Sequence, residues 1–153
     1  MLLSQRELYA TLVCLIADSA FNPNAVNFDS QVKKLESKLA AGAQYVMTQP
    51  VFDVELAQRT AQRLKPLGVP MFLGVMPLMS SRNAEFLHNE VPGIKIAEPL
   101  REKLRHCADD AAAVKIGLEV AREIRDVALE AYNGVYLITP FLRYEVSVEL
   151  LGA

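Results

Sequence analysis

The sequence is poor in the residues that build disulfide and metal sites. Among its 153 residues there are two cysteines, two histidines and no tryptophan. Cys14 and Cys107 lie far apart and form no CxxC pair, which favours a reduced cytosolic chain over a disulfide framework. His88 and His106 both fall in segments with helical periodicity, so we expect no metal site and no triad hydrolase.

The sequence also lacks an excess of charge of one sign and a long apolar run. Sixteen basic and 18 acidic residues give a net charge of -2, which provides no footprint for nucleic acid or a membrane surface. The apolar run at residues 12–17 is far shorter than the ~20 residues that span a bilayer. Arg6 and Glu7 precede it and no A-x-A cleavage pattern follows, so we interpret it as a buried strand of a cytoplasmic protein.

What remains is an ordinary globular composition, with 52% hydrophobic and 22% charged residues. No linker or low-complexity segment interrupts it, and we expect one domain over residues 1–153. Four continuous apolar runs predict strands that are covered on both faces. These runs are residues 12–17, 45–49, 71–76 and 135–139.

Helical patterns fill the stretches between the predicted strands. Residues 28–39 have apolar positions on one face before Gly42, which is a natural helix stop. Asp53 can cap a second helix, and Ser80 or Ser81 a third. A long helix is predicted from about Asp109 to Tyr132, and a last one begins near Arg143.

Four strand–helix units in succession predict an α/β fold with a parallel sheet and right-handed crossovers. A closed (β/α)₈ TIM-barrel takes about 250 residues and eight strands, so four units correspond to half a barrel. A flavodoxin-like open sheet is the alternative that the same pattern allows.

Ligands of such folds meet the carboxyl ends of the strands and the loops that follow. Those positions carry amides, aromatic residues and one arginine, in residues 18–23, 48–53, 76–78 and 139–143. The sequence has no GxGxxG, P-loop or HExxH motif. Chemistry supplied by an organic cofactor is therefore the better fit.

Several of these segments resemble one family. Residues 38–53, KLAAGAQYVMTQPVFD, are similar to the helix, "AGA" and strand ending "TQPVFD" of methylenetetrahydrofolate reductases. Residues 20–24, AFNPN, resemble the motif after that family's fifth strand, and residues 135–145 resemble its eighth. Residues 74–94 are similar to the bacterial subgroup fused to a homocysteine methyltransferase. The resemblance runs from about residue 10 to the C-terminus and implies the carboxyl-terminal half of that barrel.

The resemblance implies specific roles. Gln49 matches the glutamine that hydrogen-bonds the folate pterin and, in the other half-reaction, the nicotinamide, and Arg143 matches an arginine on the substrate side. Lys38 matches a lysine at the FAD pyrophosphate, and Phe21 an aromatic position at the flavin. The implied reaction is NAD(P)H-dependent, FAD-mediated reduction of 5,10-methylenetetrahydrofolate to 5-methyltetrahydrofolate, in one-carbon metabolism and methionine biosynthesis.

The sequence also departs from the family pattern. Asp18 and Ser19 replace small residues at a strand end, and Leu142 stands where the subgroup often has glycine. The family's catalytic glutamate on strand one, and its aspartate on strand four, have no counterpart here, so no catalytic residue is assigned. We expect the chain to need the missing barrel half or to self-associate. The alternative is a non-catalytic half-barrel that serves as an association module or is a remnant.

Overall fold

The computed structural model describes residues 18–152, which form a four-stranded parallel sheet with helices between the strands. The strands are β1 (Asp18–Phe21), β2 (Tyr45–Thr48), β3 (Met71–Val75) and β4 (Gly134–Leu137). The helices are α2 (Phe28–Ala40), α3 (Val54–Leu64), α4 (Ser81–Glu90), α5 (Glu98–Arg105), α6 (Asp110–Ala131) and α7 (Tyr144–Leu151). Two 3₁₀ turns, η1 (Lys65–Leu67) and η2 (Pro140–Leu142), complete the set.

The order of the strands in the sheet is the order in the sequence, β1-β2-β3-β4, and every neighbouring pair is parallel. This confirms the α/β class and the succession of strand–helix units. The strands predicted near residues 45, 71 and 135 are present within a residue or two of their expected bounds. The expected strand at 12–17, and Cys14 within it, lie outside the described residues.

The prediction that a loop begins at Asp18 was wrong. Residues 18–21 are strand β1, which pairs in register with β2 from Asp18–Tyr45 to Phe21–Thr48. The polar residues at its start resembled a turn in the sequence. Pairing with the backbone of a neighbouring strand overrides that local preference.

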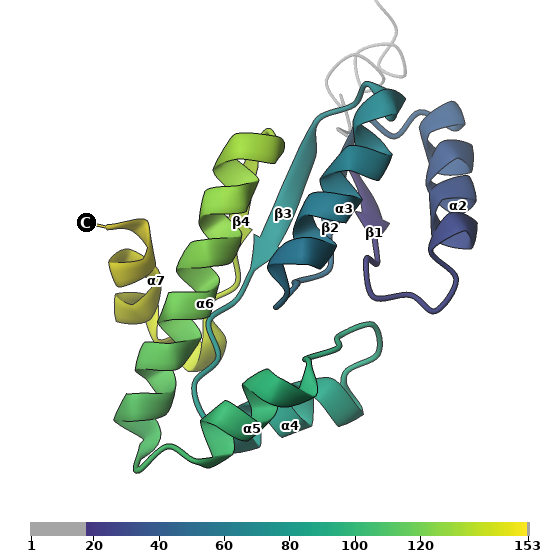
Figure 1. Cartoon of the computed structure of the whole chain (residues 1–153). Helices are drawn as coiled ribbons and strands as arrows, with labels where there is room; N and C mark the ends of the chain where they lie inside the picture. The colour runs from purple at the N-terminus through teal and green to yellow at the C-terminus, as the bar shows by residue number, and fades with distance from the viewer. Residues whose placement is uncertain (1–17, 153) are drawn as a thin grey trace, which may run out of the picture.

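The long helices and the last one lie along the sheet, as Figure 1 shows for α2, α3, α6 and α7. Their buried side chains form one core with the strand residues that face them, among them Val46, Leu73 and Val75. The predicted caps are present: Asp53 accepts from the Leu56 amide at 2.8 Å, and Ser80 accepts from the Asn83 amide at 3.1 Å.

The helices α4 and α5 are arranged differently, because they lie across the end of the sheet toward which the strands point (Figure 1). They enclose a smaller core of their own, which includes Phe52, Leu78, Leu87 and Leu104. The helix α5 was not predicted; it contributes the buried Leu104 and the partly buried Leu100 to this core. The segment after β3 therefore covers the carboxyl edge of the sheet.

Candidate functional site at the carboxyl edge of the sheet

Gln49 lies where β2 ends, and its backbone links two strands. Its amide donates to the Phe21 carbonyl of β1 at 2.7 Å. The side chain is half-buried, and its position in the alternation places it on the sheet face opposite the helix core, with Tyr45 and Met47. The predicted substrate residue is therefore at the carboxyl edge, on the face not covered by helices.

Polar groups from three segments meet around Gln49. A Cβ added to Gly93 would lie 3.5 Å from the Gln49 side-chain carbon and 2.9 Å from the Asn22 amide nitrogen. Gly93 has φ +87°, a left-handed conformation that favours glycine. Asn24 donates to the Gly93 carbonyl at 3.1 Å, and its own amide donates to the Asn22 side-chain oxygen at 2.9 Å. The loop after α4 is thus fixed beside Gln49 by the loop after β1.

Sequence reasoning assigned no role to Asn22, Asn24 or Gly93. The sequence does contain turn-forming residues at these positions, namely Asn-Pro-Asn after the first described strand and Pro-Gly after α4. Nothing in the sequence spacing shows that residues about seventy positions apart meet. The tertiary contact between the two loops makes them part of the site.

A cavity of about 530 Å³ lies at the same edge, between α4 and the turn after β4. Most of its surface is apolar, with Arg82, Ser80 and Asn83 as polar members. Ser80 and Asn83 are engaged in the local cap, since Ser80 accepts from Asn83 and Asn83 accepts from the Met79 amide at 3.1 Å. The residues that line this cavity are Met76, Ser80, Arg82, Asn83, Phe86, Leu87, Pro140 and Phe141.

Arg143 follows β4, at the same carboxyl edge but at the other side of the sheet from β1. Its Nε donates to a Glu145 oxygen at 3.0 Å, and this contact holds the pKa of the Glu145 carboxyl below its usual range. Both side chains are largely exposed. The predicted substrate arginine is therefore accessible, with a carboxylate partner that a ligand would have to displace.

Phe21 does not face the open side of the sheet. Its side chain is 1% exposed and stacks edge-on against Phe28 of α2, with 5.4 Å between ring centroids. The ring belongs to the core between the sheet and α2. The geometry does not support a direct flavin contact for Phe21.

Ser19 lies on the same helix-facing side as Phe21 and is also buried. Its hydroxyl makes no hydrogen bond with any described residue. Alternation along β1 thus turns the Ser19 side chain toward the helices and away from the open face of the sheet.

Lys38 lies in the last turn of α2, and its Nζ donates to the Ala20 carbonyl at 3.3 Å. Successive carbonyl groups along a strand point to opposite sides. The Phe21 carbonyl accepts from the Gln49 amide at the end of β2, so the Ala20 carbonyl points to the outer edge of β1. The ammonium group is exposed and close to the strand end. Of the two predicted cofactor residues, Phe21 and Lys38, Lys38 is the one that remains accessible to a phosphate.

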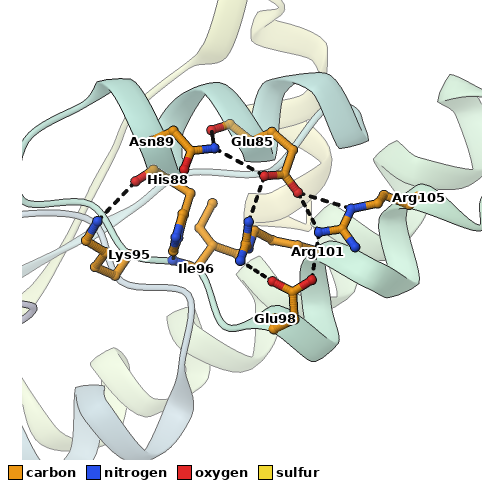
Figure 2. Close-up of polar contacts among 8 residues, drawn as sticks. All are labelled: Glu85, His88, Asn89, Lys95, Ile96, Glu98, Arg101 and Arg105. Atoms are coloured by element: carbon orange, nitrogen blue, oxygen red, sulfur yellow. Dashed lines mark hydrogen bonds and ion pairs between the residues drawn. The ribbon is translucent and has the colours of Figure 1, made fainter.

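The histidines have local structural roles. His88 Nδ1 accepts from the Ile96 amide at 3.1 Å and so helps to fix the α4–α5 connection (Figure 2). His106 is exposed and lies 3.9 Å from Glu102. Among residues 18–152 no three side chains of His, Cys, Asp or Glu are grouped to hold a metal ion, and no helix in that range is long and apolar enough to cross a membrane.

Comparison with known proteins places this geometry in a family. Residues 6–147 match the sequence profile described as methylenetetrahydrofolate reductase. The chain belongs to the methylenetetrahydrofolate reductase family. The match includes β1–β4, both loops around Gln49 and the turn with Arg143.

Individual relatives agree with this family. A probable methylenetetrahydrofolate reductase (NADPH) of Caenorhabditis elegans is 31% identical over 104 residues, which are 64% of this chain and 15% of that protein. A Clostridium thermocellum protein, described as binding two copies of 5-methyl-5,6,7,8-tetrahydrofolic acid, has a similar fold, with a TM-score of 0.65 and 23% identity. That likeness covers 98% of this chain and 58% of the other. Both relatives are thus considerably longer than the part that this chain matches.

Members of this family generally use FAD and NAD(P)H. The described residues of this chain do not form an FAD site by themselves. Phe21 is enclosed in the core, and the ammonium of Lys38 already contacts a main-chain carbonyl. Of the predicted cofactor residues, Lys38 alone could hold part of the group, as a positive charge for its pyrophosphate.

Proposed function

We propose that this chain forms the substrate-side half of a methylenetetrahydrofolate reductase. The proposed reaction is reduction of 5,10-methylenetetrahydrofolate to 5-methyltetrahydrofolate with NAD(P)H and FAD, which supplies methyl groups for methionine biosynthesis in the cytoplasm. The complete reaction would require strands that complement β1–β4. The folate is the ligand that we assign to this chain's own residues.

The position of Gln49 carries this proposal. A neutral side-chain amide offers one acceptor and two donor hydrogens, which suits the edge of a pterin ring. The amide lies at the carboxyl end of β2, where ligands of parallel α/β folds bind. Gly93 lies beside this amide, so the loop after α4 forms one wall of the proposed site.

The cavity between α4 and η2 supports the same assignment. Met76, Phe86 and Phe141 give it an apolar wall, while Arg82 is the one basic residue in its lining. Ligand pockets typically combine a mainly apolar lining with a few polar groups. A flat, partly apolar ligand with an anionic end, such as a folate, has this character.

Binding of 5-methyltetrahydrofolate tests the proposal directly. Titration followed by calorimetry should show binding to the wild-type chain, and Gln49→Ala should raise the Kd about tenfold, since one or two hydrogen bonds amount to roughly 1.4 kcal/mol. Gln62→Ala, at an exposed position on α3, is the matched control and should bind as wild type does. Equal affinity of the Gln49→Ala and wild-type chains would contradict the assignment.

A non-catalytic half-barrel is the second candidate function. One observation favours it: the acidic residue that follows β2, Asp53, is engaged as the N-cap of α3 and is not free for acid chemistry. This candidate predicts that no folate binds, even when a polypeptide with the complementary strands is added. The titration above therefore separates the two functions.

A further inference from the structure

The pairing between β2 and β3 stops before β2 ends. Strand β2 pairs with β1 as far as Thr48, but its last pair with β3 is that of Met47 with Phe72. In a regular parallel ladder the next hydrogen bond would run from the Gly74 amide to the Thr48 carbonyl. The Gly74 amide donates instead to the Thr48 side-chain hydroxyl at 3.1 Å. The ladder is therefore interrupted one residue before Gln49.

A tyrosine of β4 replaces the missing main-chain donor. The Tyr136 hydroxyl donates to the Thr48 carbonyl, although β3 lies between these two strands. Burial raises the pKa of this hydroxyl, so it stays protonated and can act as the donor. Tyr136 lines a hollow together with Tyr45 and Met47, which places its ring on the open face of the sheet, opposite the helix core. The hydrogen bond therefore crosses β3 on the open face.

Gly74 leaves the room for this crossing. It is the register partner of Tyr136, and a Cβ on Gly74 would lie 2.7 Å from the Tyr136 hydroxyl oxygen. The same Cβ would lie 2.9 Å from the Thr48 carbonyl oxygen. A glycine within a strand often marks a place where another group approaches the backbone closely. A larger residue at position 74 would displace the hydroxyl, the carbonyl or both.

The Thr48 carbonyl and the Gln49 amide belong to the same peptide unit. A peptide unit is planar, so hydrogen bonds at both of its ends restrict how it can rotate. At one end the Gln49 amide donates to the Phe21 carbonyl of β1 at 2.7 Å, and at the other the Thr48 carbonyl accepts from Tyr136. This unit leads directly into the Cα of Gln49. The direction in which the Gln49 side chain leaves the strand thus depends on both contacts.

We propose that Tyr136 is a positioning residue for Gln49. Without the Tyr136 hydroxyl, the Thr48 carbonyl is free to accept the regular ladder bond from the Gly74 amide, and the peptide unit turns to meet it. That turn moves the Gln49 side-chain amide away from its orientation toward the ligand. Tyr136 acts here on the folate site proposed above, so its effect on binding rests on that proposed function.

Binding of 5-methyltetrahydrofolate to the full chain tests this role through energetic coupling. Tyr136→Phe keeps the ring and removes the hydroxyl, and it should raise the Kd about three- to tenfold, no more than Gln49→Ala does. In a chain that already carries Gln49→Ala, Tyr136→Phe should change the Kd by less than about twofold, because Tyr136 acts through Gln49. Tyr45→Phe is the matched control and should bind as wild type does, since Tyr45 lies on the same face and contacts Phe72 through its ring.

A second measurement needs no ligand. Nuclear magnetic resonance detects a scalar coupling across a hydrogen bond between the Gly74 amide nitrogen and the Thr48 carbonyl carbon. This coupling should be absent in wild type and in Tyr45→Phe, where the Gly74 amide donates to the Thr48 hydroxyl. It should appear in Tyr136→Phe, in which the regular ladder bond forms. Near-ultraviolet circular dichroism checks that each variant is folded.

The two measurements separate this role of Tyr136 from the folate function. If wild type binds the folate and Tyr136→Phe binds it equally tightly, the positioning role is overturned while the proposed function stands. An equal loss of affinity with and without Gln49→Ala would also overturn it, because the hydroxyl would then act independently of Gln49. If wild type binds no folate, the proposed function fails and the coupling alone decides. A folded Tyr136→Phe chain without the Gly74–Thr48 coupling would overturn the positioning role in either case.

Discussion

Leu142 adopts a backbone conformation that disfavours a bulky side chain. Its φ is +58°, and that of its neighbour Phe141 is +53°. The left-handed region costs a non-glycine residue about 1–2 kcal/mol. Leu142 is 88% exposed, so its side chain recovers little of this cost by packing. A glycine would adopt this conformation without strain.

We therefore expect Leu142→Gly to stabilise the chain by about 0.5–1 kcal/mol. The variant relieves the backbone strain, and the greater entropy of glycine in the unfolded chain offsets part of that gain. Thermal unfolding followed by circular dichroism measures this change. Leu129→Gly, in the last turn of α6, should instead destabilise by up to about 1 kcal/mol through helix propensity. A lower Tm for Leu142→Gly than for wild type would mean that the turn is not strained.

The pair Phe21 and Gln49 shows what residue identity alone leaves open. Both were predicted as ligand contacts because the family resemblance implies these roles. Along a strand the side chains alternate between the faces, and the register sets Phe21 level with Thr48, one residue before Gln49. Phe21 consequently faces the helices and Gln49 the open side. A shift of one residue, which the sequence pattern does not resolve, decides between core and site.

At the scale of elements, α6 depends on one glycine for its approach to the segment after β3. A Cβ on Gly117 would lie 1.9 Å from the Leu78 carbonyl oxygen, which is backbone and cannot rotate away. Gly117 is buried in the middle of a 22-residue helix. The long helix can pack this closely against the segment after β3 only because this position has no side chain.

Gly117→Ala should for this reason destabilise the chain by about 1–3 kcal/mol, through overpacking. The usual effect of the same change inside a helix is opposite in sign, a gain of about 1 kcal/mol. Urea unfolding with both variants decides the sign, with Ala111→Gly at an exposed site of α6 as calibration. A raised unfolding midpoint for Gly117→Ala would show that α6 does not contact Leu78.

The helices α4 and α5 are joined by a network of two glutamates and two arginines (Figure 2). Glu85 of α4 accepts from Arg101 at 2.7 Å and from Arg105 at 2.9 Å, and Glu98 accepts from Arg105 at 2.7 Å. Hydrogen bonds from Arg105 are the main cause that lowers the pKa of both glutamate carboxyls. Their charged forms are thus favoured when α4 and α5 are folded.

This network should make the α4–α5 segment sensitive to acid. A carboxyl whose pKa is lower in the folded state stabilises the fold above its unfolded pKa, near 4.3, and loses that effect as the pH falls through the folded value. The protection factors of the α4 and α5 amides against hydrogen exchange should therefore fall below about pH 4.5. Glu85→Gln should remove much of this pH dependence, whereas Glu102→Gln should not, because Glu102 has only the exposed His106 nearby.

At the scale of the whole molecule, the described residues provide one side of a ligand site. The Gln49 amide and the cavity lie at the carboxyl edge of four strands; the cavity lining contains no carboxyl group, and Asp53 is engaged as the N-cap of α3. Protonation of the folate to open its ring is general-acid work. A complementary set of strands would have to supply it.

We therefore expect the isolated chain to purify colourless and to show no NADH-dependent reduction of methylenetetrahydrofolate. Adding a polypeptide that carries the first four β/α units of the family should restore a flavin spectrum and turnover. In the reconstituted protein Gln49→Ala should slow folate reduction while FAD stays bound. Flavin absorbance and NADH oxidation measure both effects, and a yellow, active preparation of this chain alone would contradict the expectation.

The sequence by itself determined the strand–helix order, the caps at Asp53 and Ser80, and the family, because these depend on residues close together in the chain. Hydrophobic periodicity and capping chemistry are local, and the family motifs are contiguous. It did not reveal α5 or the start of β1. The eight residues of α5 are short for a helix and offer two large apolar positions, Leu100 and Leu104, and a polar strand resembles a turn until its partner is known.

Only the tertiary structure decided which strand-end residues face a ligand. Strand register placed Phe21 in the core and Gln49 on the open face. Contacts between distant loops brought Asn22, Asn24 and Gly93 to Gln49, and the approach of α4 to η2 formed the cavity. These features depend on how separate elements pack. A pattern along one segment does not encode the position of another.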